Sequence, residues 1–381
     1  MHVKFVDLQK QYVRYKSQID ARISRVLSTS NFIHGPDVAE FETNFAKYIG
    51  TKHCIGVANG TDALEIAVKS CINHDNSSPP EIIVQGNTYI ASCLAATNNS
   101  CKLVVADCDA ATHMISYADL ISKCTANTKI IILVHLFGII SPDIEAIQEL
   151  CKERGIILIE DCAQAHGAKW KNAHAGTFGD ISCFSFYPGK NLGAFGDAGG
   201  ICTNNDTLAM NIRKIANLGC IKKYYHELIG RNSRLDTIQA AILDEKLKFL
   251  DEDNEKRRKF AEIYKQKLQG LVELPDIDAN CTPVFHLFVI KTSHRDILKK
   301  YLESHGIECG IHYPISITEV EAFRHLNLSP ATNCIRNSKE ILSLPIHSEL
   351  TINEVDYVCT CISTFLTHQN QFNNFILANA S

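Results

Sequence analysis

From residue 51 onward, short apolar runs alternate with stretches of helical periodicity, and this alternation limits the possible folds more than any other feature of the chain. The apolar runs occupy residues 54–58, 81–85, 102–106, 129–136 and 156–160. Alternating strands and helices are typical of a mostly parallel sheet with helices on both faces. The sequence therefore predicts a doubly wound α/β domain. In such folds, ligands bind beyond the carboxyl ends of the strands.

The segments on either side of this alternation are predicted to be mainly helical. Residues 1–50 place Val38, Phe41, Phe45 and Tyr48 on one helix face. Residues 237–269 are predicted to form one long helix. We interpret its densely charged middle, residues 250–259, as a solvated face on a bridge between two domains.

The last third of the chain mixes short strand-like and helical stretches. It reads as strands at 283–291 and 308–313, a helix at 294–305 and two closing helices. We therefore expect a large domain at residues 1–245 and a small C-terminal α+β domain at 246–381.

Charge and hydropathy exclude several classes of partner. The chain has 38 basic and 42 acidic residues, and it contains no basic block, so no nucleic-acid partner is expected. The longest apolar run, 130–140, is too short to span a bilayer and contains His135. The first residues lack the apolar core of a signal peptide. We expect a cytoplasmic protein without a membrane partner.

Sixteen cysteines could indicate disulfides or a metal site, but their spacing favours neither. They are scattered along apolar stretches without any C-x-x-C pair, and the sixteen histidines form no H-E-x-x-H motif. We expect most of the cysteines to be reduced core residues, and we predict no metal.

A glycine-rich loop between two strand-like runs, 181–186 and 200–202, carries Lys190. A lysine held away from water loses its proton more easily than a surface lysine, and a neutral amine can attack a carbonyl to form a Schiff base. The alternative is an ordinary surface lysine on a turn. A phosphate-binding P-loop is disfavoured, because Asn191 stands where that motif needs Ser or Thr.

Polar residues at the ends of other predicted strands suit a single ligand. Residues 59–62 open a helix at 63–71, whose N-terminus is either a phosphate site or a simple N-cap. Asp161 either caps the next helix or pairs with a protonated ring nitrogen. Ser185 offers a hydroxyl to phosphate, and Tyr89 offers a ring for stacking. Together with Lys190, these groups match what pyridoxal phosphate requires.

Over nearly its whole length the chain resembles the sugar aminotransferases of the DegT/DnrJ/EryC1/StrS family, which have the fold type I architecture of pyridoxal-phosphate enzymes. The resemblance is carried by residues 32–36 (FIHGP), 60–64 (GTDAL), 88–92 (TYIAS), 134–138 (VHLFG), 160–167 (EDCAQAHG), 188–194 (PGKNLGA), 232–236 (NSRLD) with 239–241 (QAA), and 312–314 (HYP).

The resemblance implies a role for each matching residue. Lys190 would form the Schiff base with the cofactor and move the proton, while Asp161 would pair with the ring nitrogen. The remaining cofactor contacts would come from Gln164 at the ring hydroxyl, Tyr89 stacked on the ring, Gly60, Thr61 and Ser185 at the phosphate, and Asn232 reaching the phosphate from the other subunit of a homodimer. The substrate side would be formed by Tyr187, His312 and Tyr313.

The implied reaction is a two-step transamination from an amino acid, glutamate in most of the family, to a nucleotide-linked keto-sugar. The lysine loop is most similar to the branch that converts dTDP-3-keto-6-deoxyhexoses into dTDP-3-amino-3,6-dideoxyhexoses. Amination at the 4-keto position of a UDP- or GDP-linked sugar is the alternative. Two segments depart from the family pattern: residues 315–318 put the sugar-side pocket in doubt, and residues 78–83 suggest a loop change far from the chemistry.

Three other interpretations are disfavoured. Dehydratases of the family carry histidine in place of Lys190. A non-catalytic pyridoxal-phosphate-binding regulator would carry a basic DNA-binding module before this domain, whereas here the domain is expected to begin with the chain. A catalytically silent α/β scaffold would not need the full set of site residues.

Overall fold

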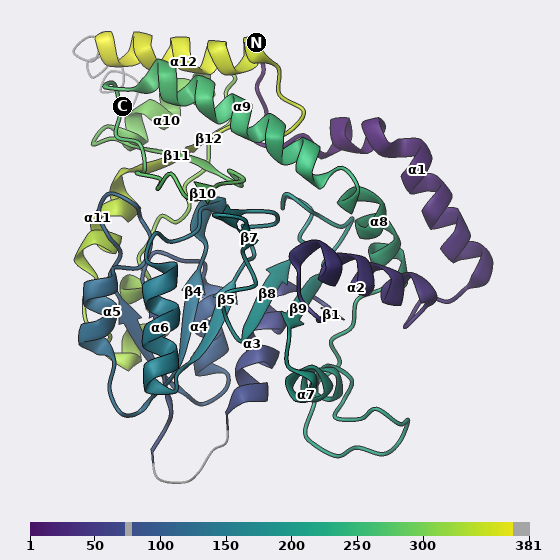
Figure 1. The fold of residues 1–381 in the computed structure, drawn as a ribbon. Coiled ribbons are helices and arrows are strands. Elements are labelled where there is room, and N and C mark those ends of the chain that lie inside the picture. The colour runs from purple at the N-terminus through teal and green to yellow at the C-terminus, as the bar shows by residue number, and fades with distance from the viewer. Residues whose placement is uncertain (73–77, 369–381) are drawn as a thin grey trace.

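The computed structural model describes residues 1–72 and 78–368, and its centre is a seven-stranded sheet (Figure 1). Its strands are β1 (His53–Val57), β2 (Glu81–Gln85), β3 (Lys102–Ala106), β4 (Thr128–Val134), β5 (Ile157–Asp161), β8 (Ile181–Ser185) and β9 (Gly199–Thr203). They lie in the order β1-β9-β8-β5-β4-β2-β3. β9 is antiparallel to both of its neighbours, and all other adjacent pairs are parallel. The predicted mostly parallel sheet is confirmed.

Helices cover both faces of this sheet and bury a separate apolar core on each (Figure 1). One core takes side chains from α2 (Pro36–Ile49), α5 (Tyr117–Lys123), α6 (Ile144–Arg154) and α8 (Thr237–Leu247). The other takes side chains from α3 (Gly60–Cys71), α4 (Ile90–Thr97) and α7 (Asp206–Ala216). Both sheet faces are therefore dry, which explains why the strands read as continuous apolar runs in the sequence.

A smaller α+β unit lies beyond one end of the sheet and has its own core (Figure 1). It contains the antiparallel pair β11 (Phe288–Lys291) and β12 (Ile341–Leu344), with α9 (Leu250–Leu268), α10 (Arg295–Ser304) and α12 (Ile352–Thr367). The fold type I architecture with a smaller C-terminal part is confirmed. The domain boundary between residues 245 and 246 falls inside α8 and stays a prediction.

The remaining elements connect these two parts. α1 (Leu8–Thr29) packs Tyr15 and Ile19 against Ile242 of α8. α11 (Thr332–Glu340) precedes β12, and two short 3-10 helices, Ile317–Glu319 and Glu321–Leu326, come before it. A minor sheet has the order β10-β6-β7, formed by Cys281–Thr282, Lys169–Trp170 and Ala173–His174. Across the described residues, no helix is long and apolar enough to cross a membrane.

The long helix expected at 237–269 is wrong, because the chain forms two helices there. α8 ends at Leu247 and α9 begins at Leu250. At the break, the ring of Phe249 stacks on Tyr15 of α1 with 4.5 Å between ring centroids. This aromatic packing favours an irregular turn here. The stretch contains no glycine or proline, so the sequence gives no signal for a helix break.

The interpretation of residues 250–259 as a solvated face is also wrong for part of the run. Asp253, Asn254 and Arg257 are buried. They lie on the same side of α9 as Ala261 and Tyr264, which belong to the core of the smaller unit. Positions spaced by three or four residues share one helix face, so these polar side chains point inward.

Residues 308–313 do not form the expected strand. Gly310 pairs with Ser343 through an isolated bridge, with the Gly310 N–H 3.1 Å from the Ser343 carbonyl oxygen. The strand that pairs with β11 is β12, which lies between the two closing helices and was missed in the sequence. Its four residues are too few to give a clear alternation.

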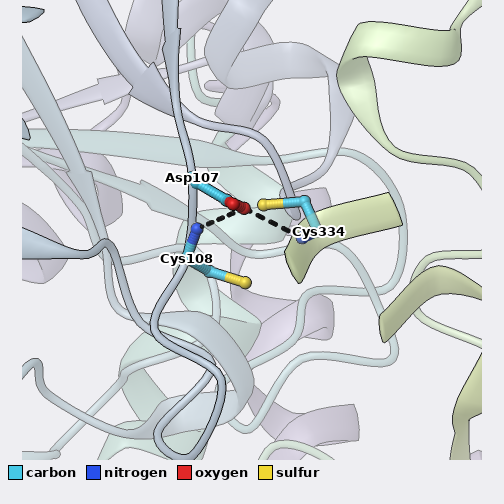
Figure 2. A group of neighbouring side chains, drawn as sticks. All are labelled: Asp107, Cys108 and Cys334. Carbon is cyan, nitrogen blue, oxygen red and sulfur yellow. Dashed lines mark hydrogen bonds between the residues drawn. The ribbon is translucent and has the colours of Figure 1, made fainter. Parts of the chain in front are cut away.

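All sixteen cysteines are free thiols, and most are buried, as expected for core residues. Two of them, Cys108 and Cys334, lie beside Asp107 just after β3 (Figure 2). The Asp107 carboxylate accepts hydrogen bonds from the backbone N–H groups of Cys108, Asn333 and Cys334, each at 2.9 Å. Asp107 therefore caps the N-terminus of α11 from the sheet and ties that helix to the large part of the molecule.

Replacing Asp107 by alanine should lower the free energy of unfolding by about 1–2 kcal/mol, because the first turn of α11 loses its acceptor. Burial alone would raise the pKa of the Asp107 carboxyl, but hydrogen bonds from Asn333 and Cys334 lower it overall. A lowered folded-state pKa stabilises the fold above the unfolded-state pKa, and this contribution disappears as pH falls through the folded-state value. Urea unfolding between pH 7 and pH 3 should show the deficit of the variant shrinking toward low pH.

The control is Glu262→Ala, at an exposed residue of α9 whose carboxylate pairs with Lys265. It should change the unfolding free energy by less than about 0.5 kcal/mol. Equal losses in the two variants would contradict the capping role of Asp107.

Candidate active site

A cavity of about 780 Å³ lies beyond the carboxyl ends of the sheet strands. The large part contributes residues at the N-terminus of α3, after β2, at the end of β5 and after β8. The smaller unit contributes Arg257, His286, His312 and Tyr313. Of the predicted site residues, those that line the cavity are Gly60, Thr61, Tyr89, Asp161, Gln164, Ser185, Tyr187, Lys190, His312 and Tyr313. Asn232 is the one predicted site residue that does not line the cavity.

Lys190 is held in a tight loop directly after β8. Its N–H donates to the Tyr187 carbonyl at 2.8 Å, and the Ala194 N–H donates to the Phe186 carbonyl at 2.8 Å. A Cβ on Gly193 would lie 2.3 Å from the Pro188 carbonyl oxygen, so only glycine fits at this position. Gly193 therefore allows the close packing of the loop, whereas a Cβ on Gly189 would meet only the Tyr187 ring at 3.9 Å.

The amine of Lys190 is easier to deprotonate than a surface amine. Burial lowers its pKa to about 8, and the negative charge of Asp161 opposes this shift. The cavity thus provides a lysine that is partly neutral near physiological pH. This finding argues against the alternative of an ordinary surface lysine on a turn.

A buried polar network fixes the lysine loop to the smaller unit. The Asn191 amide donates to Asn254 Oδ1 at 2.8 Å and to the Val284 carbonyl at 3.0 Å. Asn191 Oδ1 lies 3.1 Å from Nδ1 of His286, and Asn254 donates to the His166 carbonyl at 2.8 Å. Asn191 therefore has a structural task that Ser or Thr, the P-loop residues, could not perform with one hydroxyl.

Asp161 is the last residue of β5 and is buried. Its carboxylate accepts a hydrogen bond from the Ser92 hydroxyl at 2.7 Å and another from the Ala163 N–H at 3.0 Å. Residues 162–168 form turns, so Asp161 caps no helix and this alternative is wrong. A buried carboxylate with two donors on one side is positioned to receive a cationic group from the cavity.

The neighbouring Glu160 points away from the cavity and is fully engaged. It accepts hydrogen bonds from the N–H groups of Gly176, Phe178 and Gly179, and it lies 2.8 Å from Nε2 of His135. The backbone N–H of His135 in turn donates to the backbone carbonyl of Asp161 at 3.1 Å. Consecutive carboxylates thus have separate tasks: Glu160 orders the surrounding loops, and Asp161 faces the site.

The N-terminus of α3 forms the end of the cavity that is suited to bind a phosphate. Asn59 caps this helix, accepting the Asp62 N–H at 2.8 Å through its side chain. The first two N–H groups of the helix, those of Gly60 and Thr61, have no carbonyl within the helix to which they could donate. A Cβ on Gly60 would lie 2.6 Å from Ser185 Cβ, so glycine brings the helix end close to the Ser185 hydroxyl. The two sequence interpretations, cap and anion site, are therefore compatible, and this donor set fits a phosphate.

Gln164 and Tyr313 join the two walls of the cavity. The Gln164 side chain accepts the Phe137 N–H at 2.6 Å and donates to the Tyr313 hydroxyl at 3.0 Å. Burial raises the pKa of Tyr313, which keeps its hydroxyl protonated. The Tyr89 ring is 55% exposed and its centroid lies 5.7 Å from that of Tyr313. Its open face is available for stacking.

His312 stacks on Phe5, with 5.6 Å between the ring centroids, and its Nδ1 lies 2.9 Å from the Ser343 hydroxyl. Burial and the nearby Lys190 lower the pKa of His312 to about 4. At neutral pH this imidazole is therefore uncharged and can both donate and accept hydrogen bonds.

The structure does not bring Asn232 into the cavity of its own chain. Asn232 is exposed, its backbone pairs with Asn217, and its side chain accepts a hydrogen bond from Arg234 at 2.6 Å. The departing segment 315–318 does not line the cavity either. Ser316 and Ile317 are buried against Gly86 and the second core, so this segment packs between the two parts.

Sequence reasoning missed Ser92, Arg257 and His286, which surround the predicted residues. A signal for Arg257 was present: Leu250, Ala261, Tyr264 and Leu268 form a helical apolar stripe that passes through position 257. The density of charge in this run concealed the stripe. Ser92 belongs to the family segment 88–92, although no role was predicted for it, and for His286 the sequence offers no comparable pattern.

The reactivity of Lys190 should titrate near pH 8 in the cofactor-free protein. Competitive labelling with acetic anhydride, read by mass spectrometry, should show the acylation of Lys190 rising with a midpoint at about 8. In Asp161→Asn the midpoint should fall, because removing the negative charge disfavours the ammonium form. Asp206→Asn, a change at an exposed carboxylate bonded to Lys52, should leave the midpoint in place. A midpoint that rises in Asp161→Asn would contradict the electrostatic coupling.

Comparisons with known proteins agree with this geometry. Residues 14–363 match the model of the DegT/DnrJ/EryC1/StrS aminotransferase family. A similar protein is the dTDP-3-amino-3,6-dideoxy-alpha-D-galactopyranose transaminase of Aneurinibacillus thermoaerophilus, 39% identical over 95% of this chain and 99% of the relative.

Two solved structures share the fold. S. venezuelae DesV, in complex with a ketimine intermediate, has a TM-score of 0.91 and 35% identity over 96% of this chain and 98% of the other. Bacillus subtilis ntda, with bound cofactor PMP, has a TM-score of 0.87 and 27% identity over 96% and 86%. The chain therefore belongs to the DegT/DnrJ/EryC1/StrS aminotransferase family and is a pyridoxal-phosphate-dependent enzyme of fold type I.

Proposed function

We propose that this enzyme transfers an amino group from L-glutamate to the 3-keto group of a dTDP-linked 6-deoxyhexose, giving a dTDP-3-amino-3,6-dideoxyhexose. The observation that carries the chemistry is Lys190, whose pKa is lowered to about 8, lying in one cavity with Asp161 and an anion-binding helix end. The choice of sugar is supported by the 39% identity to a transaminase named for a dTDP-3-amino-3,6-dideoxygalactose.

The cavity residues have the chemistry needed to hold pyridoxal phosphate. The N–H groups of Gly60 and Thr61, with the Ser185 hydroxyl, would bind the phosphate, and Tyr89 would stack on the ring. Asp161 would pair with the ring nitrogen and Gln164 with the ring hydroxyl. When bound, the cofactor supplies a carbonyl for the amino group and a ring that accepts electrons released at the substrate carbon.

Lys190 is the proton carrier in this proposal. Its Nζ would take a proton from the donor Cα and later give one to the sugar carbon. A pKa of about 8 suits both directions, because the amine can exist in either protonation state near neutral pH. The Asn191 network would hold the loop, and hence Nζ, in register with the cofactor.

Tyr187, His312 and Tyr313 are proposed to contact the sugar. Tyr187 is exposed at the mouth of the cavity, whereas His312 and Tyr313 line its inner wall. The neutral imidazole of His312 and the protonated hydroxyl of Tyr313 suit the uncharged hydroxyl groups of a hexose.

The active unit is proposed to be a homodimer with shared sites. Asn232 lies on an arm after α7 that also carries Tyr224 and Ile229, which are 79% and 84% exposed. Large apolar side chains this exposed favour burial against a second copy. Asn232 would then complete the phosphate site of the other subunit.

A cytoplasmic location is part of the proposal, because all sixteen cysteines are free thiols.

The transaminase assignment is tested by two separate half-reactions followed by absorbance. L-glutamate should bleach the band of the pyridoxal form, and dTDP-3-keto-6-deoxyglucose or its galactose epimer should restore it. Lys190→Ala should lower both rates by at least about a hundredfold, since the general base is lost. Restoration by a UDP- or GDP-linked 4-keto-sugar, but by neither dTDP sugar, would refute the proposed substrate and leave the transaminase in place.

Shared sites predict complementation between two defective variants. A mixture of Lys190→Ala and Asn232→Ala should form hybrid dimers, each with one doubly altered site and one intact site. On random reassociation about a quarter of all sites would be intact, so activity should reappear after the subunits exchange. If Asn232 served its own chain instead, mixing would restore nothing.

A further inference from the structure

Arg257 of α9 is a buried cation on the cavity wall. Its side chain is only 5% exposed, yet it lines the same cavity as Lys190 and Asp161. Its Nη1 donates to the Phe285 carbonyl at 3.2 Å and to the Ile346 carbonyl at 2.7 Å. These two bonds hold the guanidinium in a fixed orientation at the junction between α9 and the β11–β12 unit.

Within residues 1–72 and 78–368, Arg257 forms no ion pair. Asp253, four residues earlier on the same helix, is taken by Arg14 at 2.7 Å and by the Tyr15 hydroxyl at 3.0 Å. The cavity is also lined by Asp62, which pairs with Arg231 at 3.1 Å, by Asp161, which is bound by Ser92, and by the exposed Asp197. The guanidinium of Arg257 donates its hydrogen bonds to carbonyls, and Asp253 offsets its charge only in part, so burial carries a desolvation cost that an anion would reduce.

The negative charge of Asp253 acts on Arg257 and opposes the effect of burial, but that carboxylate is already paired with Arg14. Lys190 and Arg257 both act on His286, whose pKa is held well below its usual value by burial and by these two cations. Burial lowers the pKa of Arg257 itself to about 10, so the guanidinium stays charged at neutral pH. Two positive charges, on Arg257 and on protonated Lys190, therefore line the cavity that a substrate must enter.

We infer that Arg257 binds a carboxylate of the amino donor, so that this enzyme takes an anionic amino acid. The inference rests on the proposed transamination. Arg257 uses Nη1 for its two carbonyl contacts, which leaves the edge formed by Nη2 and Nε to offer two parallel N–H groups, the arrangement that a carboxylate binds in bidentate fashion.

The position of Arg257 favours a small anion over a nucleotide diphosphate. The Arg257 guanidinium is bonded to the carbonyl of the apolar Ile346, which also lines the cavity, and little of Arg257 is accessible. The keto-sugar has no charge on its ring, so Arg257 would discriminate only in the half-reaction with the donor. The nucleotide of the sugar would be recognised elsewhere, at the open mouth of the cavity.

The test measures equilibrium binding rather than turnover. Calorimetry with pyridoxal-phosphate-loaded protein would compare glutarate, an unreactive dicarboxylate, with dTDP as the nucleotide probe. Arg257→Lys should bind glutarate about ten- to a hundredfold more weakly, because the bidentate contact is lost, and should bind dTDP as wild type does. The matched control is Arg258→Lys, whose neighbouring guanidinium pairs with Glu255 on the outside of the helix and should change neither affinity.

The remaining outcomes each decide the inference. Wild-type binding of glutarate by Arg257→Lys, or equal weakening of glutarate and dTDP, would overturn it, because Arg257 would then only shape the cavity. Binding of dTDP but not glutarate by the wild type would overturn it while leaving the sugar transaminase standing. Failure of both probes would refute the proposed function as well. Should Arg257→Lys not fold, a crystal structure of the wild type with glutarate decides by whether a carboxylate lies on Arg257.

Discussion

The site depends on placing opposite charges, Asp161 and Lys190, in one cavity at the ends of buried strands. Burial pushes the lysine toward its neutral form and Asp161 opposes that shift, so the balance leaves a pKa of about 8. Asp161 must therefore be held in place without a salt bridge to Lys190. The hydrogen bonds from the Ser92 hydroxyl and the Ala163 N–H hold its carboxylate there. The doubly wound sheet makes the arrangement possible, because its parallel strands bring their carboxyl ends to one edge.

The second constraint is the attachment of the small unit to the lysine loop. Asn191 and Asn254 connect this loop to α9, and the carbonyl contacts of Arg257 connect α9 to the segments around Phe285 and Ile346. A shift of α9 would therefore move both the reactive lysine and the cavity wall opposite to it. Buried polar networks of this kind are costly when partly broken, so they define one arrangement of the two parts.

The sequence predicted the sheet strands to within one or two residues, because strands that are dry on both faces leave uninterrupted apolar runs. Apart from Asn232, every predicted site residue lines the cavity, because polar residues that follow such runs meet at one sheet edge and the family resemblance supplied the rest. The break before Leu250 and the burial of Asn254 and Arg257 could not be read in the same way. They depend on tertiary contacts with Tyr15, Asn191 and the Ile346 carbonyl, none of which is near in sequence.

In the proposed transamination one cavity accepts two substrates of different charge, and its residues would divide this task by their protonation. His312 and Tyr313 are neutral at physiological pH, so they can exchange hydrogen bonds with sugar hydroxyls without attracting an anion. Arg257 stays charged and forms no ion pair in the described chain, so in the proposed reaction it would favour an acid in one half-reaction and only tolerate a sugar in the other. Since a fixed charge cannot be removed between the two halves, selectivity for the sugar must come from the neutral residues and from the nucleotide at the cavity mouth. The segment 315–318, which packs against Gly86 and the second core, would then influence the sugar only through the position of Tyr313.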